Sequence, residues 1–396
     1  MKSKAKKACK KKNKPNNLRR TIYLSVSIIF IVTIVLIGIL IFAAPDEAYS
    51  ETENRSLAQK PKVTASSLTD GTFMKDAESY TQDQFPLRDS WIAVKSFADR
   101  MLGKREINGV YLGKHNQLIE KAAEPDYTYV DKNLQAMKTF AQKYTDKNVT
   151  FALVPNSCLI QADRLPANAP IYDQNKEIDH VREEVSDALH FVDLRDSLGA
   201  HKEEYIFYKT DHHWTSLGAK YAFEAMTAVL KIDNANANYH VISAADDFYG
   251  TLSSKTGFRL EADKVDLYIP DAINNNELKY YAEYTEQKYR TASIYDADSL
   301  KKLDKYAVFM GGNFSRIDIQ TSNINGRKLM IIKDSYANAF LQFLLPYYES
   351  IYVIDPRYCY DDINSIIETE NITDILFLYN VNTFTEDRNI ADFLNF

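Results

Sequence analysis

Two short segments of the sequence combine side chains that can carry out acyl-transfer chemistry. The first, Thr210-Asp211-His212-His213-Trp214, lies where a loop enters a helix, and the second, Lys333-Asp334-Ser335-Tyr336, lies where a strand turns into a helix. A serine hydroxyl needs a base to become a nucleophile, and the usual base is a histidine held by a carboxylate. Asp211 and His213 share one side of an extended loop. We predict Ser335 as nucleophile, His213 as base and Asp211 as the orienting carboxylate.

These side chains also have interpretations that involve no catalysis. Ser335 could cap the helix that follows it, although Asp334 would cap it better. His212 should point away from its two neighbours, and we assign it a structural role. Aspartate and histidine are also zinc ligands. Because no third, distant histidine lies in an ordered motif, we expect no metal and no cofactor.

The pattern of apolar residues predicts an α/β domain around both segments. Short β-branched runs alternate with helical patterns, which indicates βα units and a mostly parallel sheet. We expect strands at 149–155, 190–193, 328–332, 351–354 and 374–378, and helices at 71–105, 131–145, 174–189, 216–230, 336–344 and 361–369. A β-hairpin is expected from residue 110 to residue 119. Ser335 then lies at the carboxyl edge of the sheet, where α/β proteins bind ligands.

The pattern changes between residues 231 and 325. Asn, Asp and Tyr dominate this segment, and its hydrophobic periodicity is weak. We predict an inserted lobe of short strands and loops at 231–325. The α/β domain then comprises residues 71–230 and 326–396.

The N-terminal region predicts a membrane anchor. Residues 22–42 are uncharged and rich in Ile, Val and Leu, which is long enough for a helix to span the hydrocarbon layer. Residues 1–20 carry ten Lys and Arg and no acid, so they should stay in the cytoplasm. We predict a basic tail at 1–20, a transmembrane helix at 21–43, a stalk at 44–70 and an extracytoplasmic domain. A cleaved signal peptide is the alternative, with Ala43-Ala44-Pro45 as a cleavage site.

Composition narrows the range of partners. The net charge is −6 although the tail is strongly basic, so the rest of the chain is acidic and does not suit nucleic acid. The 27 tyrosines suit sugar-binding grooves but also serve ordinary cores. Of the three cysteines, only Cys158 and Cys359 lie outside the tail and its anchor. They follow strands that the expected sheet keeps apart, so we expect free thiols.

Several motifs together resemble the bacterial DHHW family, named for Asp211-His212-His213-Trp214. The motifs are Glu53-Asn54-Arg55-Ser56-Leu57, Asp83-Gln84-Phe85-Pro86-Leu87-Arg88-Asp89, Asn108-Gly109-Val110-Tyr111-Leu112-Gly113, the His segment, and the segment from Lys333 to Asn338. This family is similar to alginate O-acetyltransferase proteins, which have a domain of the SGNH-hydrolase type. The resemblance implies a flavodoxin-like, three-layer SGNH fold.

The resemblance also implies a circular permutation. An SGNH hydrolase begins with its serine strand and ends with its histidine loop, whereas here Ser335 comes late and His213 early. Joining residues 328–396 to residues 149–230 restores the usual order. The SGNH glycines are absent, however, since Lys333 replaces the first of them. Oxyanion donors could be Asn380 (or Asn382) and the backbone of Gly312 and Asn313, although Gly311-Gly312-Asn313 could equally be a simple turn.

The resemblance implies acyl-ester chemistry on a cell-surface polysaccharide, with O-acetyl transfer favoured over deacetylation by an esterase. The acetyl group would come from a partner, a multi-span membrane acyltransferase. We expect substrate contacts from Trp214, Tyr336 and Arg357, although packing under the His segment is the plainer role for Trp214. A non-catalytic glycan-binding or assembly subunit on the same fold is the alternative.

Overall fold

The computed structural model describes residues 17–43, 45–50, 55–232 and 237–395, and these fall into two compact units. The first unit runs up to Ser50 and includes Arg55–Trp91, and the main part of the second is Ile92–Phe396. Our predictions for the tail up to residue 16, for Cys9 and for Glu53-Asn54 lie outside the described residues.

The first unit contains one long apolar helix, α1 (Asn17–Ala43). Its segment Arg19–Ile41 has a mean hydropathy of 3.1, which is apolar enough for a membrane span. The expected stalk contains short elements, which are β1 (Tyr49–Ser50), β2 (Arg55–Ser56) and α2 (Ala65–Thr69). The helix expected at 71–105 is two helices, α3 (Thr72–Asp83) and α4 (Arg88–Met101), and Pro86 lies in the break. Helix α4 begins in the first unit and continues in the second.

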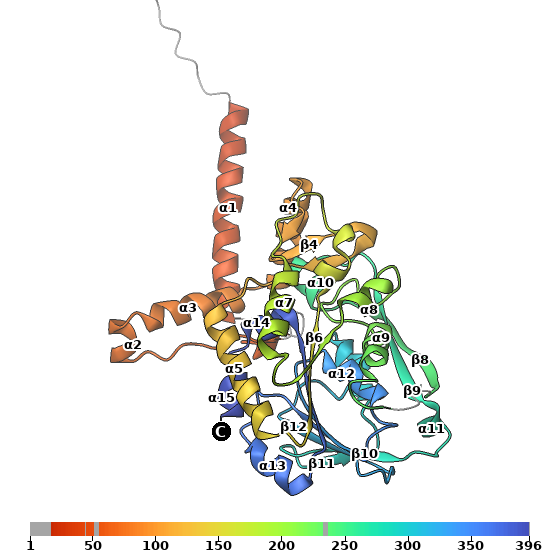
Figure 1. The fold of residues 1–396 in the computed structure, drawn as a ribbon. Coiled ribbons are helices and arrows are strands. Elements are labelled where there is room, and N and C mark those ends of the chain that lie inside the picture. Colours follow the sequence, from red (N-terminus) through yellow and green to blue (C-terminus); the bar gives the residue numbers. More distant parts are fainter. Residues whose placement is uncertain (1–16, 44, 51–54, 233–236, 396) are drawn as a thin grey trace, which may run out of the picture. The chain divides into compact units, whose positions relative to one another are not determined.

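The second unit is built on an eight-stranded sheet with the order β11-β10-β12-β14-β13-β15-β6-β7. Strands β6, β10, β11 and β12 of this sheet are labelled in Figure 1. Five strands are parallel, namely β6 (Asn148–Val154), β7 (His190–Asp193), β13 (Lys328–Lys333), β14 (Ser350–Ile354) and β15 (Asp374–Asn380). Strands β6, β14 and β15 are buried along their whole length, as their continuous apolar runs require. The parallel strands match the five that the sequence predicted.

The order of the parallel strands, counted from β13, can be compared with the orders of known α/β sheets. Numbering β13, β14, β15, β6 and β7 as one to five gives the spatial order 2-1-3-4-5. This is the order of flavodoxin-like sheets. Strand β13, which ends two residues before Ser335, takes the first place in this numbering although it comes late in the chain.

Helices cover both faces of this sheet. Alternate residues of β13 enter different hydrophobic clusters, with Leu329 and Ile331 in one and Met330 and Ile332 in the other. The second cluster includes side chains of α5 (Tyr127–Lys143), α7 (Gln174–Val185), α13 (Ile363–Glu370), α14 (Val381–Glu386) and α15 (Ile390–Leu394). The first includes side chains of α8 (Arg195–Ala200), α9 (Ser216–Met226) and α12 (Ala337–Phe340).

The segment 231–325 is more closely integrated than the inserted lobe that we predicted. Strands β10 (Tyr280–Tyr284), β11 (Tyr289–Thr291) and β12 (Arg316–Thr321) continue the main sheet, because β12 pairs antiparallel with β14. A separate ribbon is formed by β8 (Tyr239–Phe248) and β9 (Asp263–Pro270), with α10 (Thr251–Thr256) between them and α11 (Asp271–Asn274) after them. Half-buried strands rich in Tyr and Asp give a weak sequence signal, which explains the difference.

A small three-stranded sheet completes the second unit. It consists of β3 (Glu106–Ile107), β4 (Val110–Leu112) and β5 (Leu118–Glu120), which contains the expected hairpin. Helix α6 (Ser157–Ile160) follows β6. The backbone N–H of Leu118 donates to the carbonyl of Lys209, so this sheet is joined to the loop that carries the histidines.

Candidate active site

Ser335 lies in the tight turn between β13 and α12, at the carboxyl edge of the parallel strands. The turn is held by the buried carboxylate of Asp334, which accepts hydrogen bonds from the backbone N–H of Tyr336 (2.9 Å) and of Asn380 (2.8 Å). Burial raises the pKa of Asp334, and the hydrogen bonds oppose this effect. Because Asn380 ends β15, Asp334 fixes the serine turn to the neighbouring strand.

The histidines lie at the tip of a short loop between residues 206 and 215. Its two sides are joined by the backbone, with Tyr208 N–H bonded to the carbonyl of His213 and Thr215 N–H to that of Ile206. Thr215 then caps α9 by accepting the N–H of Gly218. The fully buried indole of Trp214 donates to the carbonyl of Tyr336 at 2.9 Å. This bond connects the histidine loop directly to the serine turn.

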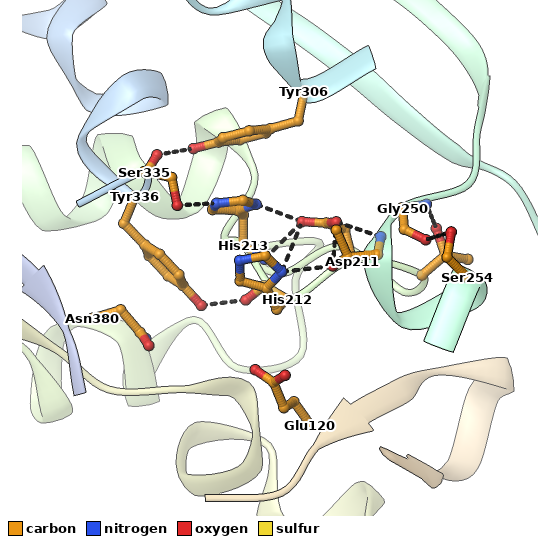
Figure 2. Close-up of polar contacts among 12 residues, drawn as sticks. Glu120, Asp211, His212, His213, Gly250, Ser254, Tyr306, Ser335, Tyr336 and Asn380 are labelled. Carbon is orange, nitrogen blue, oxygen red and sulfur yellow. Dashed lines mark hydrogen bonds and ion pairs between the residues drawn. The ribbon is translucent and has the colours of Figure 1, made fainter. Parts of the chain in front are cut away.

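The three predicted catalytic side chains form one chain of hydrogen bonds (Figure 2). His213 Nε2 is 2.7 Å from Ser335 Oγ, and His213 Nδ1 is 2.5 Å from Asp211 Oδ1. The other oxygen of Asp211 accepts two bonds from Thr251, from its N–H at 2.8 Å and its hydroxyl at 3.0 Å. The structure therefore brings Ser335, His213 and Asp211 together in the order that nucleophilic catalysis requires.

Charge and burial set the protonation of the pair formed by Asp211 and His213. Burial alone would raise the pKa of Asp211, but the two imidazoles and the hydrogen bonds from His213 and Thr251 outweigh it and hold the pKa below its usual range. Burial, and then the neighbouring His212, lower the pKa of His213. A neutral imidazole beside an ionised carboxylate is the form that can accept the proton of Ser335.

His212 does not point away from the site, and this expectation was wrong. Its ring lies 3.9 Å from that of His213, centroid to centroid, and its Nδ1 is 2.7 Å from Thr251 Oγ1. Residues 210–213 form a bend rather than an extended strand, so side chains do not alternate there. The Tyr336 hydroxyl donates to the His212 carbonyl.

The side chains of Asp211, His212 and His213 lie close enough to be considered as metal ligands, with their ligand atoms within 4.8 Å of one another. Both ring nitrogens of His213 are already paired, one with Asp211 and the other with Ser335. A metal would have to displace one of these bonds. The arrangement therefore fits a hydrogen-bonded triad better than a metal site.

The sequence matches one family of known proteins. Residues 171–354 match the DHHW protein family, and the matched region contains the histidine loop and Ser335. The resemblance to the DHHW family is thereby confirmed. No curated protein sequence matches the chain.

Solved structures that are similar to this chain include those of two proteins. A DHHW family protein from Eubacterium siraeum is 27% identical with a TM-score of 0.62, over 73% of this chain and 96% of the other. Bacillus cereus PatB1 is 19% identical with a TM-score of 0.60, and its structure with a sulfonyl adduct covers 72% of this chain and 98% of the other. A second structure of PatB1 gives the same identity and TM-score. At this identity PatB1 shows that the mixed α/β fold is shared.

Two of the predicted oxyanion donors, Asn380 and the backbone N–H of Gly312, form hydrogen bonds elsewhere. Asn380 Nδ2 donates to the Val154 carbonyl, and the Asn380 side-chain oxygen caps α14. The Gly312 N–H donates to Phe309, and the Asn313 side-chain oxygen accepts from the Lys333 ammonium. Within the described ranges, no hydrogen bond joins Asn380, Gly312 or Asn313 to Ser335.

Two of the three predicted substrate contacts are wrong. Trp214 and Tyr336 are fully buried, so neither ring can stack on a sugar. Trp214 instead packs on Phe340, with ring centroids 6.2 Å apart. Arg357 is partly exposed. Burial acts to lower its pKa, but the pairing with Asp355 at 2.6 Å outweighs burial and raises the pKa. Its contact with substrate stays a prediction.

Sequence reasoning missed three residues that build this site, all from the segment 231–325. Gly250 and Thr251, at the start of α10, surround the Asp211 carboxylate. Tyr306 covers the ring of His213. A glycine before a short helix and one tyrosine among 27 give no signal that separates them from their neighbours.

Proposed function

We propose that the domain transfers O-acetyl groups to a cell-surface polysaccharide through an acyl-enzyme formed on Ser335. The single observation that supports it most is the hydrogen-bonded series Ser335–His213–Asp211 at the carboxyl edge of the sheet. Asp211 is further oriented by hydrogen bonds from Thr251 and from the backbone N–H of His213. Every partner that this mechanism needs for proton transfer is in place before substrate binds.

The proposed reaction has two steps that share the same base. Ser335 Oγ attacks the acetyl carbonyl while His213 Nε2 takes its proton, and the tetrahedral intermediate collapses when His213 returns that proton to the leaving oxygen. The acetyl group is then an ester of Ser335. A sugar hydroxyl attacks this ester, again giving its proton to His213, and Ser335 recovers the proton as the acetylated sugar leaves. Asp211 accepts from Nδ1–H throughout and stabilises the imidazolium.

We propose the backbone N–H of Ser335 as one oxyanion donor. Among the described residues it donates to no acceptor, and it belongs to the residue that forms the acyl bond. Asn380 and Gly312 could serve only after giving up their present hydrogen bonds. An oxyanion requires donors at about 2.7–3.1 Å from the developing charge. Ser335 would supply one such donor in the resting site, and a second would be supplied when substrate binds.

The PatB1 fold supports a nucleophilic serine. PatB1 has been obtained with a sulfonyl adduct. Sulfonyl fluorides form such adducts when an activated hydroxyl displaces fluoride, which selects for a serine with a neighbouring base. We propose that Ser335 reacts in this way.

Fold and setting complete the proposal. The strand order 2-1-3-4-5 counted from β13 supports a circularly permuted domain of the SGNH type. Helix α1 supports an anchored, extracytoplasmic enzyme. A multi-span acyltransferase would supply acetyl groups across the membrane, as the sequence resemblance to alginate O-acetyltransferase proteins implies.

The test uses the full chain in detergent with 4-nitrophenyl acetate as donor. We expect release of nitrophenol by the wild type, almost none from Ser335→Ala or His213→Ala, and a smaller loss in Asp211→Asn. Ser186→Ala, an exposed serine whose hydroxyl bonds its own helix, is the matched control. Phenylmethylsulfonyl fluoride should modify Ser335, as read by peptide mass spectrometry. Equal activity of Ser335→Ala and the wild type would refute the proposal.

A second measurement separates transfer from hydrolysis. Added oligosaccharide should become acetylated while the release of free acetate falls, because sugar and water compete for the same acyl-enzyme. Acetate release that no glycan reduces would make the protein a carbohydrate esterase. Binding of glycan without any acyl chemistry would favour the non-catalytic subunit.

A further inference from the structure

Tyr306 contacts both the proposed base and the proposed nucleophile. Its ring lies parallel to the imidazole of His213, with centroids 3.8 Å apart and an interplanar angle of 9°. Its hydroxyl donates to the backbone carbonyl of Ser335 at 2.9 Å (Figure 2). Tyr306 comes from a short 3-10 helix, Lys305–Val308, within the segment that follows the histidine loop in sequence.

The surroundings hold Tyr306 in this place. It is buried, and its ring meets the edges or faces of Tyr208 and Phe309 at centroid distances of 6.1 Å and 5.3 Å. Burial raises the pKa of Tyr306 far above its ordinary value, so the hydroxyl stays protonated and can act as a donor. Both contacts of Tyr306, with His213 and with Ser335, are thus present in the resting site.

Each contact favours one part of the proposed reaction. The face of an aromatic ring is electron-rich and attracts a cation placed over it, most strongly where water is excluded. His213 becomes a cation when it takes the proton of Ser335, and burial opposes that charge. The stacked ring of Tyr306 therefore stabilises the imidazolium, and its parallel orientation fixes the plane of the imidazole.

The hydroxyl of Tyr306 acts on the nucleophile. The carbonyl of Ser335 accepts from Tyr306 and also from the N–H of Asn338 at 3.1 Å. These two bonds fix the peptide that follows Ser335 and so limit how the serine turn can move. The side chain of Tyr306 thus contacts both His213 and the Ser335 peptide and helps to hold them at a fixed separation.

We propose that Tyr306 is a positioning residue of the acyl-transfer site, which holds the imidazole of His213 against Ser335 and favours its protonated form. This inference rests on the proposed function. It assigns to the segment 231–325 a part in catalysis beyond the support that Thr251 gives to Asp211.

The test separates the ring of Tyr306 from its hydroxyl. Tyr306→Phe keeps the ring and removes the bond to Ser335, whereas Tyr306→Leu removes both. Tyr284 is the matched control, because it is buried in the same segment and its hydroxyl also donates to a backbone carbonyl, that of Met310, at 2.8 Å. The readouts are the pH profile of kcat/KM for 4-nitrophenyl acetate, kcat and KM separately, and thermal unfolding.

We expect Tyr306→Phe to lower kcat roughly three- to tenfold, with KM and the acid limb of the pH profile unchanged. Tyr306→Leu should lower kcat by about a hundredfold and move the acid limb to lower pH, because the protonated imidazole loses its partner. Tyr284→Phe and Tyr284→Leu should lower the unfolding temperature and leave the acid limb in place.

The rate at which phenylmethylsulfonyl fluoride modifies Ser335 gives a readout that needs no acetyl group. This rate should fall in Tyr306→Phe and fall further in Tyr306→Leu. It therefore tests the positioning role even if the protein does not transfer acetyl groups. The positioning role is overturned if the reagent modifies Ser335 in Tyr306→Leu at the wild-type rate. It is also overturned if the acid limb of the pH profile of this variant stays in place or moves to higher pH. Absence of any reaction at Ser335 in the wild type overturns both proposals together.

Discussion

Gly250 lies directly against the carboxylate of Asp211. A Cβ atom at position 250 would overlap the Asp211 side chain, whereas the backbone of Gly250 is in an extended region that any residue can adopt. The N–H of Gly250 also donates to the hydroxyl of Thr210 at 2.9 Å. Glycine is therefore required here for space alone, so that the start of α10 can approach the carboxylate of Asp211.

We predict that Gly250→Ala lowers kcat by about a hundredfold, because the added methyl group displaces Asp211 and with it the imidazole of His213. The control is Gly199→Ala in α8, where a Cβ meets no atom within 4 Å. That variant should keep its activity and become slightly more stable, since alanine favours helix. The measurement is ester hydrolysis together with circular dichroism. Equal activity of the two variants would show that Asp211 can move without cost.

The pH profile offers a second prediction, because the pKa of His213 is lowered by burial and by His212. The proposed base must be neutral, so activity should persist below pH 6.5, the ordinary value for histidine, and fall only as the pH drops through the lower folded-state pKa. His212→Ala removes one cause of the lowering. Its acid limb should therefore move to higher pH, with a milder loss of kcat than any triad variant.

The control for this profile is His180→Ala on α7, whose ring bonds Asp131 at 2.8 Å, outside the histidine loop. It should leave the acid limb unchanged. An acid limb near or above pH 6.5 in the wild type, or no shift in His212→Ala, would contradict the assignment of His213 as a buried base.

The parts of the site that were predictable from sequence are those with strong local patterns. The apolar run before Ser335 specifies a buried strand, and alternation in Asp211-His212-His213 suggested that the outer two side chains converge. The orientation of His212 was not predictable from alternation, because the backbone bends there. Burial of Trp214 was not predictable either, because Trp214 is bonded to Tyr336, which lies 122 positions away in the sequence.

The residues that surround the triad were hidden for another reason. Tyr306 and Thr251 belong to a segment with weak periodicity, whose strands lie at the edge of the sheet and are only half buried. The packing of such strands depends on tertiary contacts and leaves no repeating apolar pattern in the sequence. Their approach to His213 and Asp211 is therefore a property of the fold that no local spacing reveals.

A third prediction concerns the thiols. Cys158 and Cys359 are free and buried, in different hydrophobic clusters. Burial raises the pKa of Cys158 to about 12 and raises that of Cys359. Because the thiolate is the reactive form, both should react slowly with Ellman's reagent in the native protein and fully in denaturant. A Cys9→Ser background removes the tail thiol, and a peptide that links positions 158 and 359 would refute the strand order.

The last prediction concerns the membrane anchor. Helix α1 is exposed along its apolar length, as a helix that contacts lipid would be. We expect the full chain in the membrane fraction, and protease added to intact cells should remove the residues beyond about position 46 while an N-terminal tag survives. An Ile31→Arg, Ile34→Arg variant should weaken insertion, because each charge at the helix centre costs about 2.5–3.5 kcal/mol. The matched control, Ile31→Leu with Ile34→Leu, should insert normally. Intact mass of the membrane-bound protein decides between anchor and signal peptide, since a product that begins near Pro45 would mean that residues 1–44 are removed.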